Sequence, residues 1–475
     1  MPSTTPFDVE PAEALRTIRS FSGDILVDLD ETLYLQNSTE DFIDSASPRI
    51  LARLLIKFLD ILKPWRVTGG HATRDVWRLA CIRIVFPWTG WLWRRRIHRA
   101  SRSLLNQELH QALADSNQNI TILTVGFTPV VKPLITALGY RLDAVIAANP
   151  WSFKDRRNGK LWIASRRFSH DALRKSLLIT DSIDDVDILE KCGQPLRVIW
   201  PAARYRPALT KVYIPGEYLS KIKRPRERYI WRAIIQEDLF LWTLSSVPFA
   251  ATVGTHIIGL ALLCISFWTI YELGYVDNDQ AAVKFEKDPK LSETFGCVEV
   301  ETSFVKPWLW AIPFGIAGTI FLQHPMGFSV AAAGKWIAVL LATYGCFWLY
   351  NRIDKLSRTW LYVWLQFGRS AAFAILVPIT LVGAIGLASN TLARWVPYFV
   401  YRHAGKKWPG GKPEIIRLVI FLLLAVLILF AQGSSAVINW SAAVFLTWGL
   451  FRARHELRGF VQSIERLDRD GTKPV

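Results

Sequence analysis

The chain has 475 residues, and at roughly 150 residues per domain this length allows about three domains and excludes a single small module. Hydrophobic residues make up 51% of the chain and charged residues 20%, which excludes a disordered or collagen-like protein. The net charge of +17 suits nucleic acid, an anionic membrane surface or phosphorylated substrates, and the long apolar runs described below favour the membrane.

The N-terminal segment does not resemble a cleaved signal peptide, because residues 1–20 include acidic side chains and have no apolar core. We therefore expect the first half of the chain to stay in the cytoplasm. The five cysteines follow no metal-binding or redox spacing, and we expect them to be reduced packing residues. They are Cys81, Cys192, Cys264, Cys297 and Cys346.

Three short apolar runs in the first half predict buried parallel strands of an α/β domain: residues 24–28, 120–125 and 176–180. A polar residue stands at or next to the end of each run: Asp28 ends the first, Thr124 is the second-last residue of the second, and Asp181 directly follows the third. Ligands of open α/β sheets bind beyond the carboxyl ends of the strands, so we expect these three side chains to share one crevice.

Residues 38–113, between the first two runs, read as helices with interleaved Trp and Arg. Two interpretations stay open. Aromatic rings beside Arg suit the headgroup region of a bilayer, whereas an ordinary helical subdomain would bury the Trp rings and expose the Arg side chains. Under the first interpretation, we expect the soluble half to rest on the cytoplasmic leaflet.

Two carboxylates follow the first strand, in Asp28-Leu29-Asp30-Glu31-Thr32-Leu33. A turn here can aim one carboxylate at a phosphorus atom and hold the other as a proton donor. A carboxylate can attack a phosphoryl group to form an acyl phosphate, and Mg²⁺ would neutralise the clustered negative charge. An ordinary acidic turn is the alternative.

This segment resembles the first motif, DxDx[TV], of the haloacid dehalogenase-like (HAD) superfamily. The resemblance covers about residues 20–200, with Thr124 matching the second motif and residues 181–185, Asp-Ser-Ile-Asp-Asp, matching the acidic fourth motif. It implies a Rossmann-like fold with residues 38–113 as a helical cap. It also implies Asp28 as nucleophile, Asp30 as general acid/base and Thr124 as a ligand of the phosphoryl oxygens.

The resemblance further implies a Mg²⁺ site formed by Asp28, Asp30 and Asp181, completed by Asp185 or Asp184. The lysine of the third motif is less clear, because Lys154 and Lys160 both precede Asp181 at a suitable distance. We favour Lys160. The alternative is that the lysines of this basic stretch are only solvated loop charges.

Residues 204–232 form a basic connector with nine Lys or Arg and two Glu. Such a segment beside a first membrane span follows the positive-inside rule, so nucleic acid is not expected as a partner.

Four stretches without charge are long enough to span a membrane: residues 239–271, 307–334, 370–392 and 418–451. They predict an all-α polytopic membrane domain. Counting hairpins within these stretches and the run 360–388, interrupted by Arg369, gives seven or eight spans, and we favour eight. Basic loops at residues 351–358 and 394–417 and the basic tail from Arg452 favour both termini in the cytoplasm.

An acidic stretch, expected as a loop, follows the second predicted span. Carboxylates at a membrane boundary suggest a site. Asn278, Asp279 and Glu286 resemble the first acidic motif, NDxxDxxxD, of UbiA-type membrane prenyltransferases, although Ala282 and Glu286 replace two of its Asp residues. The resemblance implies a Mg²⁺-bound prenyl diphosphate, and known chains fuse a HAD-like half to a UbiA-like half in this order.

The second acidic motif of that family has no clear match, because residues 394–417 contain no Asp. Their basic side chains could hold phosphate directly, or they could be topological charges only.

These observations predict a HAD-like domain (residues 1–203), the connector (204–232), a UbiA-like membrane domain (233–455) and a cytoplasmic tail (456–475). We expect a Mg²⁺-dependent phosphohydrolase that acts through an aspartyl phosphate on a membrane-associated phosphorylated small molecule or lipid. The membrane domain would bind a lipid (prenyl) phosphate. The alternatives are an active prenyltransferase and a non-catalytic membrane scaffold.

Overall fold

The computed structural model describes residues 5–470, except residues 142–143, 325–326 and 409–410. The chain divides into two compact units, residues 1–212 and residues 213–475. We call them the α/β unit and the helical unit. An α/β domain followed by an all-α region was the fold class expected from the sequence, and this prediction is confirmed.

The α/β unit is built on a five-stranded sheet with the order β3-β2-β1-β4-β5, in which every neighbouring pair is parallel. The three expected strands form its centre: β1 (Ile25–Val27) lies between β2 (Ile120–Phe127) and β4 (Leu177–Thr180). The edge strands β3 (Val145–Ala148) and β5 (Gln194–Arg197) were not predicted.

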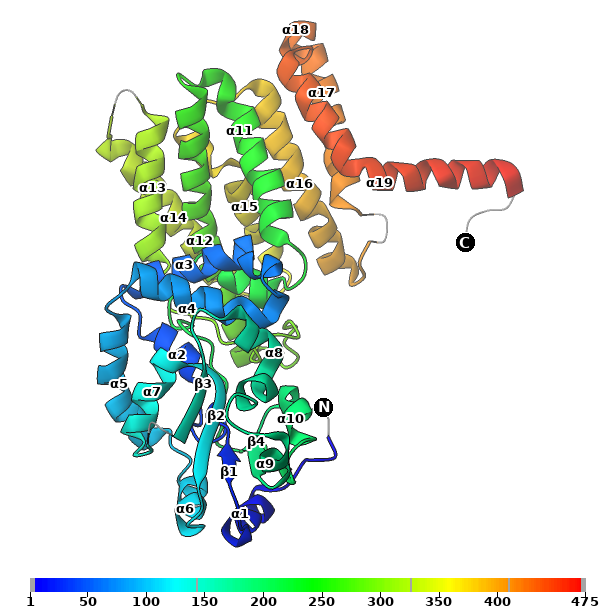
Figure 1. Ribbon diagram of the computed structural model, residues 1–475. Helices are drawn as coiled ribbons and strands as arrows, with labels where there is room; N and C mark the ends of the chain where they lie inside the picture. Colours follow the sequence, from blue (N-terminus) through cyan, green and yellow to red (C-terminus); the bar gives the residue numbers. More distant parts are fainter. Residues whose placement is uncertain (1–4, 142–143, 325–326, 409–410, 471–475) are drawn as a thin grey trace. The chain divides into compact units, whose positions relative to one another are not determined.

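Helices flank the sheet (Figure 1). The apolar side chains of the sheet and of these helices form the core of the unit. The helices outside the β1–β2 connection are α1 (Pro11–Ser20), α7 (Thr128–Ala137), α8 (Phe153–Ala164), α9 (His170–Arg174) and α10 (Val186–Leu189).

The connection from β1 to β2 is helical. It comprises α2 (Ser38–Asp44), α3 (Arg49–Leu62), α4 (Arg74–Val85), α5 (Thr89–Ser103) and α6 (Gln107–Asp115), with 3₁₀ turns at Pro64–Val67 and Gly70–Thr73. Some Trp residues of this connection are buried, as in an ordinary helical subdomain, and others are exposed, as expected for contact with a bilayer. Trp65 and Trp93 are buried in the core, whereas Trp88 and Trp91 are exposed.

The helical unit begins with two π-helical segments, η5 (Leu219–Lys223) and η6 (Ile230–Leu239). The longer helices that follow are α11 (Phe240–Ser246), α12 (Val253–Phe285), α13 (Trp308–Leu322), α14 (Val330–Tyr350), α15 (Arg358–Ala371), α16 (Leu381–Ala404), α17 (Pro413–Gln432) and α19 (Trp440–Asp470). Short turns lie at η7 (Val247–Phe249), η8 (Ala372–Ile375) and α18 (Ser434–Val437).

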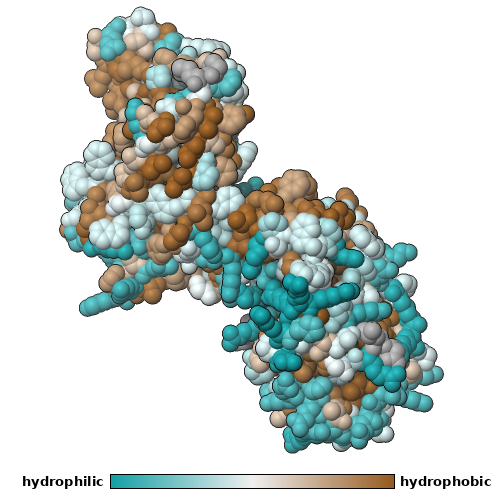
Figure 2. Space-filling view, turned by 90° about the vertical axis from the view of Figure 1, so that its left-hand side faces the viewer, coloured by the Kyte–Doolittle hydropathy of each residue, from teal (hydrophilic) through white to brown (hydrophobic). Residues whose placement is uncertain are grey.

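Three helices in the described part of the chain are long and apolar enough to cross a membrane, namely α12, α14 and α17. Hydrophobic side chains cover much of the visible surface of this unit (Figure 2). The expected number of eight spans is therefore wrong. The stretch 239–271 breaks at Val247–Phe249, and the stretch 418–451 breaks at Gly433, whose φ is 85°. Helix α13 has only 15 residues, about 22 Å, and α15 only 14.

The acidic stretch after residue 271 is not a loop, because α12 continues without interruption to Phe285. Residues 253–288 contain no Pro, so no proline interrupts the helix over this range. The basic segment 394–417 is likewise helical over much of its length: α16 continues to Ala404 and α17 starts at Pro413. The side of a membrane on which the termini lie stays a prediction.

Candidate functional site

The carboxyl ends of three neighbouring strands bring the expected polar residues to one edge of the sheet. Asp28 follows β1 and is 4% exposed, Thr124 lies on β2 and is buried, and Asp181 follows β4. The parallel register places Val27 opposite Ile122 on one side and Ile179 on the other, so β1 and β4 end at nearly the same level, while β2 continues past Thr124 to Phe127.

Among the described residues, Lys160 is the cation that contacts the carboxylates of Asp28 and Asp185 at this edge. Its Nζ lies 2.7 Å from Asp28 Oδ2 and 2.5 Å from Asp185 Oδ2, and its side chain is 2% exposed. Gly159 precedes it with a φ of 74°, a conformation that a residue with a Cβ adopts only under strain, and this kink interrupts α8. Lys154, the other lysine considered from the sequence, is exposed.

Two threonines hold the carboxylates in place. Thr180 Oγ1 lies 3.1 Å from Asp28 Oδ2 and accepts a hydrogen bond from Lys160. Thr32 Oγ1 donates to Asp181 Oδ1 at 3.1 Å. Thr180 was given no role from the sequence, although its position as the last residue of a strand, directly before Asp181, is a signal that could have identified it.

Asp30 lies on the turn after β1, where Glu31 has a φ of 58°. A non-glycine residue in this region is strained by roughly 1–3 kcal/mol, and here the turn redirects Asp30 so that its Oδ1 accepts the backbone N–H of Ser38 at 2.7 Å. Gly126 packs against Asp30 and Thr124. A Cβ at Gly126 would lie 3.1 Å from Thr124 Oγ1 and 3.4 Å from Asp30 Oδ2. Gly126 was not predicted from the sequence.

Burial is the main influence on these carboxyl groups. It raises the pKa of Asp28 to about 7, and the charges of Asp185 and Asp181 add to this rise while Lys160 opposes it. Burial also raises the pKa of Asp30 and that of Asp181, each to about 6. Burial alone would lower the pKa of Lys160, but Asp185 and Asp28 outweigh it and shift that pKa upward. One ammonium therefore compensates the surrounding carboxylates only in part.

The residues at this edge fit a Mg²⁺ ion bound in the manner usual for enzymes of phosphate esters. Among the described residues, no three His, Cys, Asp or Glu side chains are grouped so that they could hold a metal by themselves. Mg²⁺, however, is commonly held by one or two carboxylates, with phosphate and water as the other ligands. Asp28 and Asp181, at the carboxyl ends of the neighbouring strands β1 and β4, are the two carboxylates that could act in this way. Asp185 contacts Lys160, and the side chain of Asp184 is exposed.

The acidic residues of α12 have a different arrangement. Asp279 accepts hydrogen bonds from Tyr218 at 2.8 Å and from Lys223 at 2.6 Å. Asn278 donates to Asn351. Glu286 pairs with Arg358 at 3.2 Å and with Lys355 at 3.4 Å. Lys223 also donates to Asn278 Oδ1 at 3.4 Å, so Asn278 and Asp279 share one lysine, whereas Glu286 has different partners.

A second charged cluster in the helical unit was not expected from the sequence. The carboxylate of Glu237 accepts hydrogen bonds from Arg394 on α16 and Arg452 on α19. Arg417 on α17 lies 3.6 Å from the same carboxylate and donates to Asn390. Arg417 is 4% exposed, and its Nε and one terminal nitrogen have no hydrogen-bond partner. Arg369, which also pairs with Asp238, lies 4.0 Å from the same carboxylate. Four guanidinium groups therefore contact the carboxylate of Glu237.

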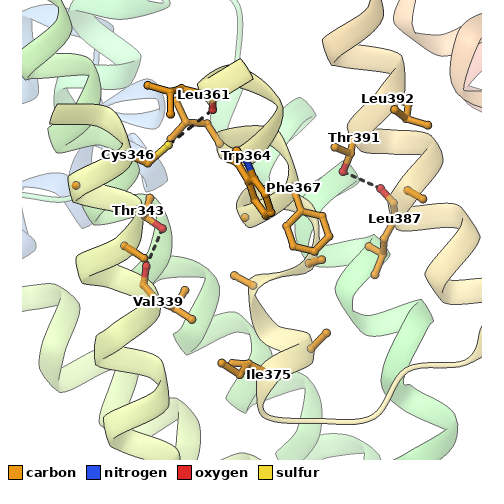
Figure 3. A pocket seen from close by; sticks show the side chains of 18 of the residues that line it. Val339, Thr343, Cys346, Leu361, Trp364, Phe367, Ile375, Leu387, Thr391 and Leu392 are labelled. Carbon is orange, nitrogen blue, oxygen red and sulfur yellow. Dashed lines mark hydrogen bonds between the residues drawn. The ribbon is translucent and has the colours of Figure 1, made fainter. Parts of the chain in front are cut away.

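An apolar cavity of about 950 Å³ lies between α14, α15 and α16 (Figure 3). In the view, Trp364 and Phe367 lie on α15 between the labelled residues of α14 and those of α16. The few polar side chains of the lining are satisfied locally, since Thr343 and Thr391 each donate to a carbonyl on their own helix. Arg394 follows the lining residue Leu392 by two positions on α16.

Comparisons of the chain with models of known protein families, with curated proteins and with solved structures found no match.

Proposed function

We propose that the α/β unit is a Mg²⁺-dependent phosphohydrolase or phosphotransferase of the HAD type, with Asp28 as the nucleophile. The observation that carries this proposal is the buried contact of Lys160 with Asp28 at the carboxyl ends of β1 and β4, beside β2. Asp30, Thr124 and Asp181 meet at the same edge. An ordinary acidic turn would have its carboxylates in water, whereas here Asp28 is buried, Asp30 and Asp181 are half-buried, and all three have raised pKa values.

In the proposed reaction, a carboxylate oxygen of Asp28 attacks the phosphorus of a phosphate ester. The bond between phosphorus and the ester oxygen breaks, and the Asp30 carboxyl gives its proton to the departing oxygen. Asp30, now ionised, accepts a proton from water as that water attacks the phosphorus of the aspartyl phosphate. Inorganic phosphate leaves, and Asp28 is regenerated as a carboxylate.

The remaining residues bind and orient. Thr124 would donate its hydroxyl proton to a phosphoryl oxygen, while Gly126 leaves room beside it and donates its N–H to Thr124 Oγ1 at 2.9 Å. Lys160 would hold Asp28 ionised and contribute positive charge to the transferred group. When bound, Mg²⁺ would supply the charge that lets a phosphate dianion enter a site rich in carboxylates.

Turnover of p-nitrophenyl phosphate by the purified full-length protein tests this proposal. Asp28→Asn should abolish Mg²⁺-dependent hydrolysis and leave the circular dichroism spectrum unchanged. Asp171→Asn is the matched control, because it makes the same change in an exposed side chain of the α/β unit outside the site and should keep full activity. Full activity of Asp28→Asn would overturn the assignment.

A second function is favoured by the guanidinium cluster at Glu237. We propose that the helical unit binds a lipid phosphate in the manner of UbiA-type proteins, with the prenyl or similar chain in the apolar cavity and the phosphate on Arg394, Arg417 and Arg452. Buried guanidinium groups with unused N–H donors are costly inside a membrane unless an anion pairs with them. Arg pairs well with phosphate, since its N–H groups match two phosphoryl oxygens.

Binding of farnesyl phosphate to the detergent-solubilised protein tests this second function. Arg417→Gln should weaken the binding at least tenfold, whereas Arg454→Gln, an exposed change on α19, should not alter it. Equal affinity of both variants would contradict the proposal.

An active prenyltransferase is the alternative for this unit. Transfer of label from a prenyl diphosphate to an acceptor, lost in Asp279→Ala, would favour it. A non-catalytic scaffold would show neither hydrolysis nor transfer, and Mg²⁺ binding would be the same in the wild type, Asp181→Ala and Asp279→Ala.

A further inference from the structure

Helix α3 of the α/β unit is apolar on two opposite faces, but only one of them is packed. Ala52, Ile56 and Leu59 are buried in the core of the unit. The other face repeats with helical spacing along the whole helix and is exposed. Its residues are Ile50, Leu51, Leu54, Phe58, Ile61 and Leu62.

The exposure of this second face is large. Phe58 is 56% exposed and Ile61 is 77% exposed. A helix that is apolar around its circumference is normally buried, and a contiguous exposed patch of large apolar side chains marks an interaction surface. In Figure 2, hydrophobic surface is visible on the α/β unit as well as on the helical unit.

Helix α4 and the turn after it continue the apolar surface. Arg74 at the start of α4 pairs with Asp60 near the end of α3, so the two helices run antiparallel. At the opposite end, the Trp88 indole donates to the carbonyl of Ser47, directly before α3. The exposed side chains of Ile84, Val85 and Trp88 thereby lie beside the first turn of α3. We call the exposed apolar residues of α3 together with Ile84, Val85 and Trp88 the α3–α4 face.

The charges at the border of the α3–α4 face are basic. Lys63 and Arg66 are exposed just beyond the end of α3. Further along the chain, on the helix α5 that follows Trp88, Arg94 and Arg95 are also exposed, and Arg95 lies over the Trp91 ring at 3.5 Å. The acids of the two helices are already paired, Asp60 with Arg74 and Asp75 with Arg78 and Arg156. The border therefore attracts anions.

We propose that the α3–α4 face is a membrane-surface site, which lies in the interface of a bilayer that contains anionic lipid. Its apolar centre presents no polar atoms that would need a hydrogen-bond partner, its Trp88 side chain suits the headgroup level, and its basic border complements anionic headgroups. In its described part the chain has three helices long and apolar enough to cross a membrane, and the α/β unit is covalently joined to them, so a bilayer that these helices cross would lie within reach of this unit. Binding at this face does not depend on the proposed chemistry at Asp28.

The occupant of the face can be identified on the full-length protein in lipid nanodiscs that contain phosphatidylglycerol. Nitroxide labels at Phe58→Cys and Ile61→Cys, in a background without the native cysteines, report depth through their accessibility to oxygen and to a water-soluble nickel chelate. Gln111→Cys on α6, an exposed position away from the face, is the matched control. We expect the face labels to be accessible to oxygen and shielded from nickel, and the control to be accessible to nickel.

Two results would overturn the proposal. Nickel accessibility equal to that of the control would show a face in water, and shielding from both reagents would show a face covered by protein, either this chain or a second copy. A further variant separates binding from a folding defect. Leu54→Glu, Phe58→Glu and Ile61→Glu together change only exposed side chains, so the fold should persist while a label at Ile84→Cys becomes accessible to nickel.

Discussion

The α/β unit and the helical unit both contain acidic side chains beside a buried or half-buried lysine, but the ratio of charges differs. At the strand ends, Lys160 serves both Asp28 and Asp185, with Asp30 and Asp181 close by. On α12, Asp279 is the one carboxylate that Lys223 contacts, and Tyr218 donates to it as well; the other acceptor of Lys223 is the neutral amide of Asn278. A cluster with excess carboxylate can accept a cation and a phosphate, whereas a carboxylate with its own partners is already neutralised. The number of counter-charges separates a reactive site from a structural pair.

Removal of the two lysines tests this comparison most strongly. Lys160→Met leaves two buried carboxylates without their cation, which should cost about 3–5 kcal/mol of unfolding free energy and abolish hydrolysis. Lys223→Met affects a side chain that is 19% exposed and one carboxylate that keeps its tyrosine, so we expect about 1 kcal/mol and no change in hydrolysis. Denaturant unfolding and turnover assays measure both. Equal losses in the two variants would remove the distinction.

The general acid should be the next largest effect. Asp30→Asn removes the proton donor but keeps the shape, and we expect hydrolysis to fall about 10²- to 10⁴-fold. The loss should be smaller for p-nitrophenyl phosphate, whose leaving group is stable as an anion, than for an alkyl phosphate ester. A loss that does not depend on the leaving group would assign Asp30 to positioning alone.

The pH dependence of folding stability should distinguish the carboxylate cluster of the α/β unit from the paired carboxylate on α12, and it can be measured without an activity assay. Carboxyls with a raised pKa stabilise the folded state below their unfolded pKa of 3.8 and lose this contribution as the pH rises through the folded pKa values, here about 6 to 7. A tenfold difference in proton affinity between the folded and unfolded states corresponds to about 1.4 kcal/mol. The metal-free α/β unit should therefore become less stable between pH 4 and pH 8, and Mg²⁺ should restore stability at pH 8 but not at pH 4. Thermal unfolding of wild type and Asp28→Asn measures this, and an equally steep pH dependence in Asp28→Asn would contradict it.

The smallest expected effect is at Gly126. Gly126→Ala would bring a methyl group within 3.1 Å of Thr124 Oγ1 and 2.9 Å of a Val131 methyl, so these side chains must shift. We expect a loss of about 1 kcal/mol in stability and about tenfold in hydrolysis. Gly90→Ala, where a Cβ meets no atom within 4 Å, is the control and should change neither.

The central sheet was predictable because β1, β2 and β4 are short runs of buried apolar residues that end in polar side chains. The edge strands were harder to predict. Strand β3 has only four residues, and β5 contains Pro195. An edge strand tolerates a proline, but a proline in a short run of sequence normally argues against assigning a strand there. The choice of Lys160 over Lys154 depends on the kink at Gly159, which redirects the chain by one residue's dihedral angles. Hydropathy alone could not show where the apolar stretches break into separate helices, and charges from η6, α16, α17 and α19 meet at Glu237 only through the tertiary fold.

Detection of the phosphorylated enzyme tests the central claim most directly. The full-length protein is incubated with Mg²⁺ and acetyl phosphate, quenched in acid and digested, and the peptides are analysed by mass spectrometry before and after treatment with hydroxylamine, which cleaves acyl phosphates. We predict a hydroxylamine-sensitive phosphate on Asp28, absent from Asp28→Asn and retained for longer in Asp30→Asn, where the attacking water lacks its base. Hydrolysis without phosphate on Asp28, or the same phosphopeptide in Asp28→Asn, would contradict the account.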